Sequence, residues 1–170
     1  MRLLQRRPVR SVGRNSPPLR KNRRRGSQLV EAGLMLIPFF AMAFMTIDTA
    51  WAIFVKATLQ HAVREGVRYG VTGQVSNGNG HIESIKKVVQ SNSLGLLKGS
   101  QSSTLSVQFL DPGTLTTTSN NQGGNLVQVS VTNYQITPLA PLLRAATAVP
   151  VTVTSVDMIE GSPGGVAPTP

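Results

Sequence analysis

The chain of 170 residues has no cysteine, only 14% charged residues and only 5% aromatic residues. The absence of cysteine excludes disulfide bonds, thiolate metal sites and cysteine nucleophiles. The two histidines, His61 and His81, have no carboxylate pair, nucleophile motif or phosphate-binding loop beside them in the sequence. We therefore interpret both as ordinary surface residues, and we expect no enzyme, no metal and no cofactor.

The positive charge is confined to one end of the sequence. Residues 1–25 hold nine Arg and one Lys without an acid, whereas residues 26–170 hold seven basic and seven acidic residues. The formal net charge of +10 therefore belongs to this N-terminal arm. Such a segment has three prolines and few apolar residues, so we expect it to be a disordered cytoplasmic leader, residues 1–26.

A long apolar run follows the arm. From Ala32 to Val55 the only charged residue among 24 positions is Asp48. As a helix this run measures about 36 Å, enough to cross a hydrocarbon core of about 30 Å. We predict a transmembrane helix over 27–55 with Glu31 and Asp48 near the two interfaces and a kink at Pro38.

Beyond the apolar run the sequence predicts a small α+β domain over residues 56–160. Helical spacing continues without a break through Leu59, Ala62, Val63 and Val67, until Gly70 and Gly73 indicate a stop. Gly66 inside this helix suggests that another element approaches it closely. A second helix is predicted from His81 to Gln90, extending toward Leu97.

Alternating apolar residues then predict three antiparallel strands around 105–109, 127–131 and 149–153, so we expect a small antiparallel sheet of three to four strands. The polar, Gly-rich insert 111–125 is predicted to be an exposed loop or a wide hairpin connection. A short helical turn is expected around Leu142 to Ala146. The tail 161–170 is expected to be disordered. The apolar face of the sheet should pack on the part of the long helix that leaves the membrane.

The junction RRRGSQLVEAGLMLIP, residues 23–38, combines several features with separate physical meanings. Arginines hold a membrane protein's terminus in the cytoplasm, and Gly26 offers a protease an unhindered, extended backbone. Glu31 places a single acid at the boundary of the bilayer.

With these features the junction resembles that of type III or IV prepilins, which a leader peptidase cuts after the glycine. The chain is similar, more specifically, to the TadE-like pseudopilins of the tight-adherence (Flp) pilus system. The resemblance rests on VEAGLMLIPFF at 30–40, TIDTAW at 46–51 and HAVREGVRYGV at 61–71, with Pro138 and Glu160 in the later strand pattern. It departs from the major Flp pilins at Ala32, where they have tyrosine.

The resemblance implies a minor pilin or pseudopilin that acts in assembly or priming of a Tad/Flp-type pilus or a related secretion system. It implies cleavage between Gly26 and Ser27 by a prepilin peptidase, and pairing of Glu31 with the freed amino group. Partners would be the lipid bilayer, other pilin-like subunits and the Tad machinery, with a single pass through the inner (cytoplasmic) membrane and the domain outside the cytoplasm. The expected subunit contact is the cluster of Arg64, Glu65, Gly66, Arg68 and Tyr69.

Two other interpretations start from the same residues. Ala50, Trp51 and Ala52 form a small-x-small pattern after an apolar run, as at a signal-peptide cleavage site before a secreted or signal-anchored binding domain. The basic arm would also bind nucleic acid through phosphates, but it contains no aromatic residue to stack on bases. Orientation of a membrane helix explains the same charges without a second function.

Overall fold

The computed structural model describes residues 23–76, 78–140 and 148–161. The first element is one long helix, α1, from Arg23 to Val71. It ends where Gly73 adopts a positive φ of 63°, a conformation that glycine reaches without steric cost. The backbone N–H of Glu160 donates to the carbonyl of Val71 at 3.0 Å, so the end of the chain's last strand is tied to the end of this helix.

The second helix, α2, runs from His81 to Asn92, close to the predicted His81 to Gln90. Its first turn is closed by Ser84, whose backbone N–H and hydroxyl both donate to the carbonyl of Gly80. Leu94 and Gly95 take positive φ values directly after the helix and turn the chain away from it. A short 3-10 helix, η1 (Gly99–Thr104), leads from there into the sheet.

The sheet has four antiparallel strands in the order β2-β1-β3-β4. They are β1 (Leu105–Leu110), β2 (Thr117–Thr118), β3 (Leu126–Ile136) and β4 (Val149–Met158). This confirms the predicted α+β fold. The two-residue strand β2 lies within the insert 111–125, which therefore forms the wide hairpin connection between β1 and β3.

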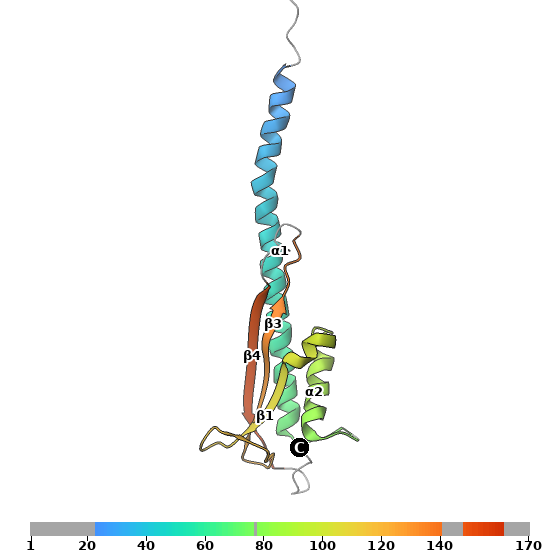
Figure 1. The fold of residues 1–170 in the computed structure, drawn as a ribbon, viewed down its shortest axis with the longest axis vertical. Coiled ribbons are helices and arrows are strands. Elements are labelled where there is room, and N and C mark those ends of the chain that lie inside the picture. The colour runs from blue at the N-terminus through green and yellow to red at the C-terminus, as the bar shows by residue number, and fades with distance from the viewer. Residues whose placement is uncertain (1–22, 77, 141–147, 162–170) are drawn as a thin grey trace, which may run out of the picture. The chain divides into compact units, whose positions relative to one another are not determined.

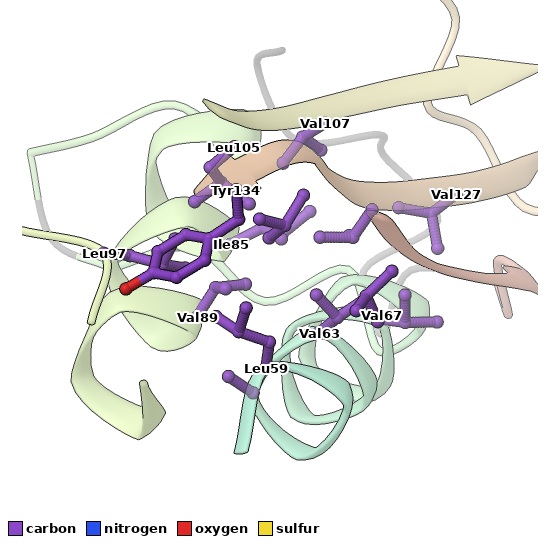
Figure 2. Packing of buried hydrophobic residues seen from close by; sticks show 14 of the residues in the cluster. Leu59, Val63, Val67, Ile85, Val89, Leu97, Leu105, Val107, Val127 and Tyr134 are labelled. Carbon is purple, nitrogen blue, oxygen red and sulfur yellow. The ribbon is translucent and has the colours of Figure 1, made fainter. Parts of the chain in front are cut away.

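The core lies between one face of the sheet and the C-terminal part of α1, with α2 beside it (Figure 1). Alternate residues of the strands face inward, since Val127, Val129 and Val131 of β3 are completely buried. They belong to one cluster with side chains of both helices, and Figure 2 shows Val127 close to Val63 and Val67 of α1. The predicted packing of the sheet on the helix is thereby confirmed.

A β-bulge keeps the second half of β3 in register with the core. The pairing with β4 shifts between Val131 and Tyr134, and Asn133 adopts a φ of 57°. The backbone N–H of Asn133 donates to the hydroxyl of Thr152 on β4. The extra residue returns Tyr134 and Ile136 to the buried face, where burial raises the pKa of the Tyr134 phenol.

The chain divides into two compact units, residues 1–41 and residues 42–170. Every core residue of the described structure belongs to the second unit, with Val55 nearest to the N-terminus. The predicted helical turn at Leu142 to Ala146 and the predicted tail after Gly161 lie outside the described residues.

Candidate membrane anchor and assembly surface

The N-terminal part of α1 exposes apolar side chains around its whole circumference. Leu34, Met35, Ile37 and Phe39 are each exposed by 65% or more, although they follow one another within two helical turns. A helix that is apolar on all sides has no hydrophilic face to turn toward water. Within Gly26–Val71, α1 is long and apolar enough to cross a membrane.

Polar groups inside this run are satisfied within the helix. The hydroxyls of Thr46 and Thr49 donate to the carbonyls of Met42 and Met45, four residues earlier. Such internal bonds suit a helix in lipid, where no water is available to a free hydroxyl. Pro38 lies inside α1 and has no N–H to donate to the carbonyl of Leu34, which is the physical basis of the predicted kink.

The junction residues all lie in the first turns of α1. Gly26 and Ser27 are helical, so the extended backbone predicted for Gly26 is wrong. The first four N–H groups of a helix lack intrahelical acceptors, and such an end unwinds easily for a protease. Ser27 and Glu31 are one helical turn apart, on the same side of α1, and Glu31 is exposed.

Asp48 binds the connection that leaves β3. Its Oδ1 accepts the backbone N–H of Leu139 at 2.7 Å and the backbone N–H of Ala140 at 3.0 Å. Its Oδ2 is buried and accepts no hydrogen bond. The sequence predicted Asp48 as an acid at the membrane interface. It gave no signal of the hydrogen bonds to Leu139 and Ala140, which lie 91 and 92 positions further along the chain.

The glycines of α1 are packed directly against α2. A β-carbon at Gly66 would overlap the Cγ2 of Val89, and one at Gly70 would lie 2.9 Å from the Cδ1 of Ile85. The close approach predicted at Gly66 is confirmed, and the approaching element belongs to the same chain. This use of Gly66 leaves its neighbours on the outer face of α1 as the surface available to a second subunit.

Those neighbours surround a shallow hollow. Arg64 and Arg68 are exposed, while Glu65 and Tyr69 are half-buried. The hollow, of about 220 Å³, is lined by Glu65, Arg68, Tyr69, Thr72, Gln74 and Val88. The hollow thus places Arg68 beside Tyr69, and arginine and tyrosine are both enriched in protein interfaces.

His81 is fully buried, so its interpretation as a surface histidine is wrong, whereas His61 is exposed. The Nε2–H of His81 donates to the carbonyl of Gly70 at 3.1 Å, and its Nδ1 accepts the side-chain amide of Asn121 at 3.2 Å. The ring also stacks on Phe109 at 5.4 Å. Burial lowers the pKa of the imidazole, and the bond to Gly70 opposes this shift only in part.

These contacts give His81 a structural role that joins α1, α2 and β1. Among the described residues, no group of three or more His, Asp or Glu side chains is placed to hold a metal ion. The arrangement around His81 offers a neutral imidazole with both nitrogens already engaged, so no nitrogen is left to act as a base.

Residues 26–68 match the family model described as TadE-like protein. Over this segment the chain is similar to the TadE-like family. The match covers about a quarter of the chain, from the leader junction to Arg68 in the outer face of α1. Comparison with curated proteins and with solved structures gave no match.

This match to the TadE-like family implies a pilin-like protein associated with a Tad pilus. Proteins of this kind are generally structural rather than enzymatic. The matched segment includes the exposed apolar turns of α1 and the residues of α1 up to Arg68 that pack in the core. The family match therefore covers both the candidate membrane span and part of the helix that supports the domain.

Proposed function

We propose that this TadE-like protein is a minor pilin or pseudopilin that acts as a membrane-anchored assembly or priming subunit of a Tad/Flp-type pilus or related secretion apparatus. One observation carries the proposal. The helix α1 is fully exposed and apolar at its N-terminal end, yet it supplies Leu59, Ala62 and Val63, each without exposed surface, to the domain core. Anchor and domain therefore share one continuous helix, which suits pilin-like assembly by packing of helices.

The proposed membrane span covers residues 27–47. These 21 residues measure about 31 Å, which matches a hydrocarbon core of about 30 Å. The span to Val55 predicted from the sequence would extend past Asp48 and would compete with the protein core, where Val55 is only 1% exposed. Ending the span at Ile47 leaves Asp48 at the interface, free to hold Leu139 and Ala140.

The orientation follows from charge. Ten basic residues precede Gly26, and basic segments beside a membrane helix stay in the cytoplasm. The chain then crosses the inner membrane once, and the domain lies on the outer side. Removal of the arm after Gly26 would leave a chain with seven basic and seven acidic residues.

Glu31 has a specific part in this proposal. After cleavage, the new amino group on Ser27 would lie one helical turn from the Glu31 carboxylate of the same chain, or beside that of a neighbouring helix. Pairing makes an acid at the lipid boundary tolerable and links packed helices. The hollow beside Arg68 and Tyr69 would supply the second contact, outside the membrane.

A secreted domain released by cleavage after Ala52 is the alternative, and the structure supports it less well. Trp51 and Ala52 pack against the core, and Asp48 holds the β3–β4 connection. Cleavage there would remove a full turn of helix that the folded domain uses.

The test combines cell fractionation with mass measurement. The full chain should sediment with envelope membranes, and deletion of residues 27–47 should release the domain while preserving Asp48. The intact mass should correspond to a chain that begins at Ser27. A start at Ile53 would support the alternative, and a water-soluble full-length chain would overturn the anchor itself.

A further inference from the structure

Among the residues that the structure describes, charged side chains are sparse at the end of the domain near Asp48. Residues 126–140 and 148–156, which include β3 and most of β4, contain no charged side chain. Along α1 the next charged residue after Asp48 is Lys56, about 12 Å further on. At the opposite end, Asp157 and Glu160 follow one another within four residues.

The register of the sheet fixes which residues share that end. Val149, the first residue of β4, pairs with Ile136, the last residue of β3. Three residues beyond Ile136 the backbone reaches Leu139, whose N–H binds Asp48. Leu139 and Val149 are each 53% exposed, so two large apolar side chains face outward beside the acid.

An aromatic pair lies on α1 at the same level. Trp51 stacks on Phe54 with ring centroids 5.6 Å apart, one turn beyond Asp48, and both rings remain partly exposed. Tryptophan concentrates at membrane–water interfaces, where its ring is apolar and its N–H stays hydrated. Exposed leucine and valine beside a tryptophan are typical of a surface that enters lipid headgroups.

We propose that the Asp48 end of the domain rests in the headgroup layer of the bilayer, with Trp51, Leu139 and Val149 inserted among the lipids. The proposal depends on the proposed span, because that span ends at Ile47 and therefore places Asp48 at the lipid boundary. The bond from Asp48 to Leu139 then holds the β3–β4 connection at the same depth. The bilayer would thus position the domain through two separate segments of the chain.

The experiment uses the full chain in vesicles of phosphatidylethanolamine and phosphatidylglycerol. Because the chain has no cysteine, Leu139→Cys and Val149→Cys each create a single site for a fluorescent label. Met158→Cys is the matched control, since Met158 is 52% exposed and lies at the far end of the same strand. Sedimentation of each variant with the vesicles is measured alongside.

Lipids that carry a quencher just below the headgroup should quench the labels at 139 and 149 about threefold more than the label at 158. Iodide in the water should show the reverse order. Equal quenching at all three sites in a chain that still sediments with vesicles would overturn this inference and leave the anchor intact. Protection of 139 and 149 from both quenchers would overturn it in favour of a second protein copy at this end. Loss of sedimentation would reject the anchor and this inference with it.

Discussion

Gly66 of α1 lies directly beneath Val89 of α2, with no room between them for a β-carbon. The two helices can approach this closely because Ala62 and Gly70 flank the same contact with small side chains. The contact joins the anchor helix to the domain near the outer hollow. The contribution of this contact to the stability of the domain can be tested by adding one methyl group at position 66.

Gly66→Ala should destabilise the domain by about 1–2 kcal/mol. Overpacking costs about 1–3 kcal/mol, and the better helix propensity of alanine returns up to about 1 kcal/mol. Denaturant unfolding of the detergent-solubilised chain measures the change. Gly33→Ala is the control, because nothing lies within 4 Å of a β-carbon at Gly33. Equal stability of the two variants would contradict the close packing.

Stability should depend on pH through His81. Burial lowers its folded pKa below the ordinary 6.5, so the unfolded chain binds the proton more readily. The stabilisation is complete above about pH 6.5 and declines as the pH falls from there through the folded pKa, with a slope of at most about 1.4 kcal/mol per pH unit. Protonation would also place an Nδ1–H against the amide donor of Asn121.

Thermal unfolding between pH 5 and 7.5 tests this dependence. His81→Gln should lower stability by about 1–3 kcal/mol at neutral pH, because an amide loses the stacking on Phe109 and cannot bond both Gly70 and Asn121 as the ring does, and it should flatten the pH profile. His61→Gln should keep the profile, since His61 is exposed. A profile that persists in His81→Gln would assign the dependence to another group.

The order of helices and strands was predictable from the sequence because each helix and strand has its own spacing of apolar residues. Leu59, Ala62 and Val63 recur at helical spacing, and Val127, Val129 and Val131 alternate. The burial of His81 was not predictable, because its partners Gly70 and Asn121 are 11 and 40 positions away. The fold brings these residues together, and a single sequence carries no signal of contacts between residues so far apart in the chain.

Removal of the Asp48 carboxylate should free the start of the β3–β4 connection. Asp48→Ala deletes the acceptor of two backbone N–H groups, so hydrogen exchange at Leu139 and Ala140 should accelerate by about tenfold or more, as expected for a loss of about 1.4 kcal/mol. Exchange measured by mass spectrometry on the peptide that contains both amides reports the change.

Asp111→Ala is the matched control for Asp48. Asp111 also accepts two backbone N–H groups, those of Gly113 and Thr114, and these bonds lower the pKa of its carboxyl. Its removal should accelerate exchange only in its own turn. If Asp111→Ala also accelerated exchange at Leu139 and Ala140, the effect would reflect general destabilisation and not the bond from Asp48.

Glu31→Gln should separate anchoring from assembly. The substitution removes the charge that would pair with the Ser27 amino group but keeps the shape of the side chain, so membrane sedimentation and the cleavage site should not change. Recovery of other pilin-like subunits with the tagged chain from solubilised membranes should fall by about tenfold or more, because breaking a buried ion pair costs about 3 kcal/mol or more.

Glu83→Gln, at an exposed acid on α2, should leave that recovery unchanged. Unaltered recovery with Glu31→Gln would show that the acid only marks the lipid boundary, and the search for the assembly contact would then move to the hollow beside Arg68 and Tyr69.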